Sequence, residues 1–464
     1  MDSYSNVKEL LGSLQGAVAV SDGQLRIHDE KKLASQLMDT LVFNAVFAGD
    51  EVKAAARWLI WESGQQLGVV PSSIQGLYEA RGRGEAGGGY TVPAMNIRAL
   101  TYDVGRAAIR AAMQHNVGAF IFEIARSEMG YTDQRPDEYA IVLVAAALRE
   151  GFRGPIFIQG DHFQANRKRW EKDPAAEIDG IKKLIDEAIP AGFYNIDIDT
   201  STLVDLSQPT TEEQQRNNFA NAAELTAYIR SRQPEGVTIS VGGEIGEVGG
   251  KNSTPEELHA YMQGYLQELR ARGADLKGIS KISIQTGTEH GGVVLPDGRI
   301  ADVALDFAVL KSLSLIARSQ YGLAGAVQHG ASTLPDEAFH KFVEAECAEV
   351  HLATAFQNML YESPHFPDDL RREMYDFLHR EFADQKKEGQ TEEQFIYKTR
   401  KNAFGPFKRR LWELPAETRD ALGRELEAKF AFYYQQLAVA NTRDLVDQWV
   451  KPVRISRPLP ASLK

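Results

Sequence analysis

The middle of the chain alternates eight short apolar segments with stretches that have the spacing of amphipathic helices. Apolar runs of this length are typical of strands that are buried on both faces of a parallel sheet. Eight strand–helix units in succession favour a closed (β/α)8 TIM barrel, an α/β fold, over an open sheet. The expected strands are residues 91–96, 119–123, 155–160, 194–199, 238–244, 281–286, 323–328 and 348–353.

The segments on either side of this region are charged and have a helical pattern. Three consecutive glycines, 87–89, separate the first segment from the barrel. We predict an N-terminal helical extension at 1–88, a barrel at 89–360 and a C-terminal helical extension at 361–464. A chain of 464 residues suits this division, since one barrel commonly takes about 250 residues.

Charge and cysteine content exclude several classes of protein. The net charge of −12 argues against a nucleic-acid partner, which requires a basic face. The single cysteine, Cys347, cannot form an intrachain disulfide. The N-terminus lacks the pattern of a signal peptide, and no apolar run approaches the ~18 residues of a membrane span. We therefore expect a cytoplasmic protein without a membrane partner, and a homo-oligomer, the commonest kind of assembly among soluble oligomers.

Three of the ten histidines fall at or just after the predicted ends of strands. His162, His290 and His329 follow the third, sixth and seventh strands. The carboxyl ends of parallel barrel strands meet at one mouth, where working residues lie. Three imidazoles with an open coordination position form a catalytic zinc site. A single histidine at a strand end is usually an ordinary hydrogen-bonded residue, so the prediction depends on the three together.

Carboxylates end the three neighbouring strands. Asp161, Asp199 and Glu244 close the third, fourth and fifth strands. Buried carboxylates are rare unless they are paired or bind a metal. Asp197 points to the same face as Asp199 and is a rival for its role. The alternative is that these groups form ion pairs with lysine or arginine in the loops.

Small residues flank the second and third of these histidines. Gly291 and Gly330 directly follow His290 and His329, and Ser332 lies two residues further on. Backbone N–H groups in such loops can hold an oxyanion, although glycine-rich loops also occur as simple tight turns. Arg126, after the second strand, is a further candidate for an anion site.

Segments from about 90 to 360 resemble the class II, metal-dependent fructose-bisphosphate aldolases. The resemblance implies that Asp161 is catalytic, that the three histidines bind Zn²⁺ or another divalent metal, and that Asp199 and Glu244 orient it or bind a second cation. It also places Asn96 in the opening strand and a phosphate loop after His329. The matching segments, in family order, are 90–96 (YTVPAMN), 160–162 (GDH), 192–201 (GFYNIDIDTS), 241–250 (VGGEIGEVGG), 287–291 (GTEHG) and 329–335 (HGASTLP).

The sequence departs from the family pattern at several polar positions. Asn252 stands where the family has an acidic residue that moves a proton, and Gly242 replaces the first glutamate of its motif. Alanines occupy 353 and 355, where the family has Asn-x-Asp, and Ala125 replaces a serine. The segment around 123–132 is similar to the non-catalytic type of tagatose-bisphosphate aldolase subunit.

The leading hypothesis is an aldehyde-lyase of carbohydrate metabolism that acts on a ketose or ketose phosphate through a metal-stabilised enediolate. In it Asp161 moves the proton of the hydroxyl group, and His162, His290 and His329 hold the metal. Two alternatives are a non-catalytic partner subunit of an aldolase and a zinc-dependent enzyme of another reaction class on the same barrel.

Overall fold

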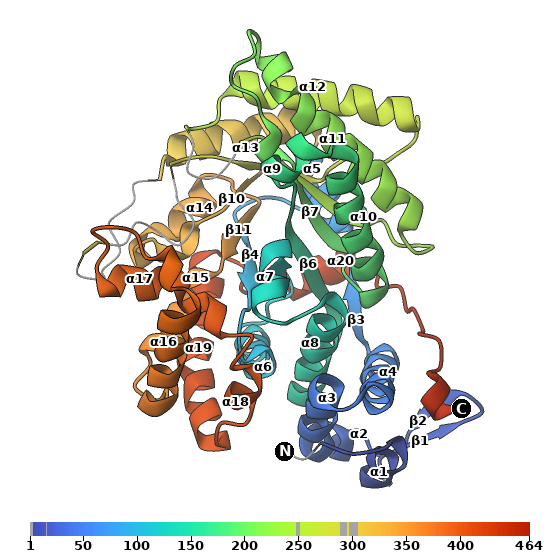
Figure 1. Ribbon diagram of the computed structural model, residues 1–464. Coiled ribbons are helices and arrows are strands. Elements are labelled where there is room, and N and C mark those ends of the chain that lie inside the picture. Colours follow the sequence, from blue (N-terminus) through green and yellow to red (C-terminus); the bar gives the residue numbers. More distant parts are fainter. Residues whose placement is uncertain (1–2, 15, 247–250, 288–294, 297–304) are drawn as a thin grey trace.

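A closed barrel of eight parallel strands forms the centre of the molecule (Figure 1). The structure is a computed structural model that describes residues 3–14, 16–246, 251–287, 295–296 and 305–464. Parallel pairing runs from β4 through β11 and back to β4. The strands are β4 (Val92–Asn96), β5 (Ile121–Ala125), β6 (Gly154–Gln164), β7 (Asn195–Asp199), β8 (Ser240–Glu244), β9 (Lys281–Ile284), β10 (Ala326–Gln328) and β11 (Glu349–Leu352).

The predicted (β/α)8 barrel is therefore confirmed, and each apolar segment corresponds to one strand. All residues of these strands are buried except three in β6. Strands that are buried on both faces do not alternate apolar and polar residues, as the sequence indicated. The helices between the strands are α6 (Thr101–Gln114), α7 (Arg126–Tyr131), α8 (Pro136–Glu150), α9 (Arg167–Lys172), α10 (Pro174–Ala191), α11 (Thr211–Arg232), α12 (Pro255–Arg272), α13 (Phe307–Tyr321) and α14 (His340–Glu344).

Local sequence sets where several of these helices begin and end. Helix α10 starts with the Asp173 side chain accepting from the N–H of Ala176, followed by Pro174 at the first helical position. It ends at Gly192, whose φ of 102° few other residues tolerate. Helix α12 starts with a capping box between Thr254 and Glu257. These ends keep the loops that lead into the barrel short.

The N-terminal segment is mostly helical, and two of its helices, α3 (Met38–Phe47) and α4 (Asp50–Leu67), pack against α8. It also supplies β3, which pairs in parallel with the first residues of β6. Its elements are α1 (Val7–Ser13), the hairpin β1 (Val18–Ser21) and β2 (Gln24–Ile27), α2 (Glu30–Lys32), α3 (Met38–Phe47), α4 (Asp50–Leu67), β3 (Val69–Ser72) and α5 (Gln75–Gly82).

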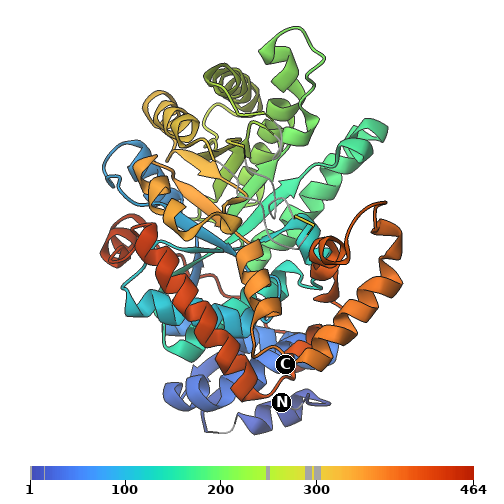
Figure 2. The same ribbon diagram turned by 90° about the vertical axis from the view of Figure 1, so that its left-hand side faces the viewer.

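The C-terminal helices pack around the barrel (Figure 2), with α19 (Ala416–Gln436) against α6 and α20 (Arg443–Trp449) against α5. Tyr434 of α19 donates a hydrogen bond to the carbonyl of Ala108, and Arg110 pairs with Glu427 at 2.7 Å. No helix in the described part of the chain combines the length and apolar character of a membrane span. The helices are α15 (Thr354–Glu362), α16 (Asp368–Glu381), α17 (Glu392–Thr399), α18 (Lys408–Trp412), α19 (Ala416–Gln436) and α20 (Arg443–Trp449).

The last fourteen residues return to the N-terminal helices. The guanidinium of Arg457 lies 3.8 Å from the ring centroid of Trp61 in α4 and pairs with Asp137 at 2.6 Å. The indole N–H groups of Trp58 and Trp61 donate to the carbonyls of Arg457 and Ile455. The two ends of the chain therefore stabilise each other.

Replacing the guanidinium of Arg457 should weaken this junction. Arg457→Ala removes a cation–π contact and charge-assisted hydrogen bonds, so we expect a loss of about 2–3 kcal/mol in the free energy of unfolding. Urea unfolding followed by circular dichroism measures it. Arg454→Ala is the matched control, because Arg454 is exposed, and it should change stability little. Equal losses in the two variants would contradict the prediction.

Candidate metal centre

A bulge in β6 brings two consecutive side chains into the barrel mouth. The pairing of β6 with β7 shifts register between Gly160 and Phe163, so one extra residue is accommodated on β6. His162 there has a φ of +40°, a strained value for a non-glycine residue. In a regular strand Asp161 and His162 would point to opposite faces. The bulge lets both face the same site, as bulges beside active sites often do.

Gly160 makes this bulge possible. A Cβ atom at this position would lie 2.3 Å from the ring of Phe163, which folds back over the glycine. The sequence Gly-Asp-His therefore combines a required small residue with two functional ones.

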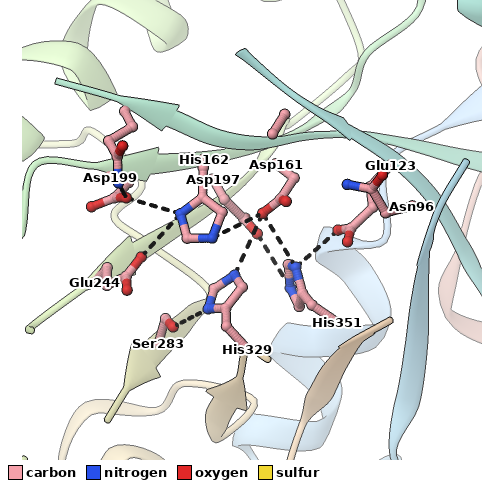
Figure 3. Close-up of polar contacts among 12 residues, drawn as sticks. Asn96, Glu123, Asp161, His162, Asp197, Asp199, Glu244, Ser283, His329 and His351 are labelled. Carbon is pink, nitrogen blue, oxygen red and sulfur yellow. Dashed lines mark hydrogen bonds and ion pairs between the residues drawn. The ribbon is translucent and has the colours of Figure 1, made fainter. Parts of the chain in front are cut away.

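Three imidazole rings surround one carboxylate oxygen, Oδ1 of Asp161 (Figure 3). It lies 3.7 Å from Nε2 of His162, 3.4 Å from Nε2 of His329 and 3.3 Å from Nδ1 of His351. The ring centroids of His162 and His329 are 4.2 Å apart, and those of His329 and His351 are 4.1 Å apart. The rings come from β6, from the residue after β10, and from β11, so the tertiary fold assembles the cluster.

The other nitrogen of each ring contacts a polar side chain deeper in the protein. Nδ1 of His162 is 2.9 Å from Asp199 Oδ2, and Nδ1 of His329 is 2.7 Å from the hydroxyl of Ser283. Nε2 of His351 is 2.7 Å from Glu349 Oε1. Such outer partners fix the orientation of imidazoles that bind metals.

A second carboxylate accompanies Asp199 on the far side of His162. Oε2 of Glu244 lies 3.5 Å from Nδ1 of His162. Asp199 accepts hydrogen bonds from the hydroxyl and N–H of Ser201 and from Gln164. The structure thus brings together Asp161, His162, Asp199, Glu244 and His329, all of which the sequence indicated.

Ionic partners lie beneath the histidines, inside the barrel. Lys281 is 1% exposed and contacts Asp197 Oδ2 at 3.0 Å, Gln159 Oε1 at 2.8 Å and the carboxylate of Glu349. Asp197 therefore pairs with Lys281, whereas Asp199 faces His162. Of the two rival carboxylates on β7, Asp199 is therefore the one that contacts a predicted metal ligand.

The charges of these groups depend strongly on one another. Burial would raise the pKa of Asp161, but the charge of His162 and contacts with His329 and His351 hold it well below its usual value. Burial and the charge of Asp199 raise the pKa of Glu244. Burial and the neighbouring imidazoles lower the pKa of His329, which keeps this ring neutral and able to bind a metal.

A cavity of about 290 Å³ opens over this cluster. Of the predicted substrate-binding residues, Asn96, Gly330 and Ser332 line it. Arg126 instead pairs with Glu177 at 2.6 Å and donates to the carbonyl of Gln164, and it is not part of the cavity lining. His290 and Gly291 lie outside the described residues, so their predicted roles remain predictions.

Two site residues escaped the sequence interpretation. Glu123 on β5 and His351 on β11 both line the cavity and lie 2.9 Å apart. Their signal was weak, since each is a single charged residue within a strand. The pattern that could have indicated them is the pair Glu349 and His351, two polar residues at alternate positions of a buried strand.

The side chains present suit a divalent cation. Several sets of three carboxylate or imidazole groups have ligand atoms within 4.8 Å of one another, including Asp161 with His162 and His329, and His162 with Asp199 and Glu244. Oδ1 of Asp161 is buried and makes no hydrogen bond within the described part of the chain. Imidazole and carboxylate ligands together fit zinc and similar transition metals.

One family model matches most of the chain. Residues 84–408 match the family model described as fructose-bisphosphate aldolase class-II. No curated protein sequence matches the chain.

Two solved structures are similar to the chain over most of its length. One, from Sinorhizobium meliloti 1021 and described as a probable tagatose 6-phosphate kinase, has a TM-score of 0.51 and 19% identity over 80% of this chain and 96% of its own. The other, a fructose-bisphosphate aldolase from Campylobacter jejuni, has a TM-score of 0.47 and 17% identity over 80% and 97%. At this identity the first supports the fold.

The Asp197–Lys281 ion pair explains why Gly242 stands where the family pattern has glutamate, because it leaves no room for a side chain. A Cβ atom here would lie 2.3 Å from Asp197 Oδ1 and 3.0 Å from Lys281 Cε. We expect Gly242→Ala to cost about 1–3 kcal/mol through overpacking, measured by thermal unfolding. In the control Gly130→Ala, a Cβ atom would meet nothing within 4 Å, and no loss should follow. An unchanged melting temperature in Gly242→Ala would refute the explanation.

Proposed function

The chain belongs to the class II fructose-bisphosphate aldolase family, and from this premise we propose that it is a metal-dependent aldolase. It would cleave or form a carbon–carbon bond in a ketose or ketose phosphate. The observation that carries the proposal is the arrangement of His162 and His329 around Asp161 at the floor of an open cavity. His290, from the same predicted triad, would complete the metal ligands.

The metal, when bound, supplies a Lewis acid that polarises a carbonyl group. His162, His290 and His329 would hold it, with Asp199 fixing the orientation of His162 through the 2.9 Å contact at Nδ1. Glu244, beside the same nitrogen, would orient this ring too or bind a second cation.

Asp161 would move the proton that accompanies bond cleavage. In a retro-aldol step a base takes the proton of the hydroxyl group, this oxygen becomes a carbonyl, and the electrons of the carbon–carbon bond pass to the other fragment. Asp161 is 5% exposed, lines the cavity and has a pKa that keeps it ionised, so it can accept the proton. The reverse transfer serves condensation.

The cavity wall supports a substrate that differs from fructose 1,6-bisphosphate. Ala125 and Ala353, which replace polar residues of the family pattern, both line the cavity. Lys401, from the segment beyond the predicted barrel, also lines it, and so does Arg98, which pairs with Glu128 at 2.7 Å. We therefore propose an anionic ketose other than fructose 1,6-bisphosphate, with Ser332 and Gly330 available to its phosphate group.

Asp161→Asn should cut turnover by roughly 100-fold or more, the scale of general acid–base catalysis. The amide cannot accept the proton, yet the three histidines are unaltered, so the ion that they hold should stay bound. Steady-state kinetics across a panel of ketoses and ketose phosphates, together with metal analysis, measure both effects. Asp137→Asn, outside the cavity, is the control. Full turnover in Asp161→Asn would assign the proton to another group.

Removal of the metal should abolish activity, and Zn²⁺ or Co²⁺ should restore it. The measurement is turnover after chelation and after stepwise return of the ion. Activity that survives complete chelation would exclude this mechanism. A protein that binds metal but turns over no ketose would instead favour a non-catalytic partner subunit.

A further inference from the structure

Glu123 and His351 form a separate polar cluster on the side of Asp161 away from His162. Oε2 of Glu123 is 2.9 Å from Nδ1 of His351, which is also 3.3 Å from Asp161 Oδ1. The ligand atoms of these three residues lie within 4.8 Å of one another. Asn96 is the direct neighbour of Glu123 in the pairing of β4 with β5, and Figure 3 shows the two side by side.

Oxygen atoms in this cluster lack partners. Oε1 of Glu123, Oδ1 of Asn96 and Oδ1 of Asp161 are buried and accept no hydrogen bond from any residue that the structure describes. The three residues are 0%, 1% and 5% exposed. Leaving a buried acceptor unsatisfied costs free energy. Three such acceptors at the wall of one cavity point to a positively charged or hydrogen-donating occupant.

The outer partner of His351 turns this ring toward the cluster. Glu349 Oε1 lies 2.7 Å from Nε2 of His351, and Glu349 also accepts hydrogen bonds from Lys281, Tyr78 and Gln159. Glu349 thus holds the Nε2 edge of His351, and Nδ1 faces Glu123 and Asp161. A carboxylate on the far ring nitrogen is the arrangement found behind histidines that bind metals.

The charges at the barrel mouth also favour additional cations. Six carboxylates are buried together here, and the one buried lysine among them in the described structure is Lys281. Carboxylates this close together repel one another, and a cation among them offsets the cost of burying them. The carboxylates are those of Glu123, Asp161, Asp197, Asp199, Glu244 and Glu349.

We propose that Glu123 and His351, with Oδ1 of Asp161 and Oδ1 of Asn96, form a second site for a divalent transition metal. It is distinct from the site that faces His162 and His329 and from the Asp199–Glu244 pair. Carboxylate and amide oxygens with one imidazole suit Mn²⁺, Zn²⁺ or Fe²⁺. Because Asp161 borders both sites, the two ions would lie close together, as in two-metal centres about 3.5–4 Å apart.

Counting bound Mn²⁺ tests the site without reference to catalysis. The full-length protein is stripped with a chelator, loaded with Mn²⁺ and separated from free ion, and the metal per chain is measured. Glu123→Gln and His351→Asn should each bind one equivalent fewer than the unaltered protein. Glu177→Gln and His259→Asn, which lie outside the cavity lining, are matched controls and should keep the full number.

Electron paramagnetic resonance of the same samples gives a second readout. Two Mn²⁺ ions that share Asp161 should show an exchange-coupled spectrum, which Glu123→Gln and His351→Asn should convert to that of isolated ions. Thermal unfolding of each variant checks that it is folded. If one of the two variants does not fold, the other still tests the site. Because metal is counted directly, failure of the proposed aldolase activity would leave this result unaffected.

Two outcomes would overturn the proposal. If both variants bind as much Mn²⁺ as the unaltered protein, Glu123 and His351 form an internal ion pair only. If both lose all bound Mn²⁺ while remaining folded, there is one shared site and no second one.

Discussion

The buried ammonium group of Lys281 anchors the charged interior of this barrel. Its contacts with Asp197, Gln159 and Glu349 join β9, β7, β6 and β11 through side chains rather than through the sheet alone. Breaking such a buried pair leaves an uncompensated charge, which is strongly destabilising. Lys281 positions Glu349, Glu349 contacts His351, and His351 contacts Asp161 and Glu123.

Local strain in β6 has a functional consequence. The bulge and the positive φ of His162 cost free energy, and such strain persists only where surrounding packing holds it. Here Phe163 closes over Gly160, and Asp199 binds the far nitrogen of His162. The result is that Asp161 and His162, neighbours in the chain, act on the same cavity. The proposed metal ligand His162 and the proposed proton-transfer group Asp161 are thereby placed side by side on one strand.

The segments outside the barrel contribute to both stability and the site. The N-terminal part adds β3 to the sheet, and Arg457 at the other end stacks on Trp61. Lys401, from the C-terminal part, lines the cavity together with the barrel's own Arg98 and Glu128. Only the C-terminal part of these two segments contributes to the cavity lining, so it can vary there without changing the proposed metal ligands.

The sequence by itself determined the barrel and a large part of the site. Strands that are buried on both faces are continuously apolar, so apolar runs indicate them in the sequence. The carboxyl ends of parallel barrel strands converge, and this rule located Asp161, His162 and His329. Glu123, Lys281 and His351 could not be assigned in this way. Glu123 and Lys281 are isolated charges within their strands, and Lys281 pairs with Asp197, 84 residues away. His351 contacts Glu349 on its own strand, but Glu123 and Asp161 reach it from other strands. Only the tertiary structure decided these pairings and the β6 bulge, because register and the closing of the barrel set which side chains meet.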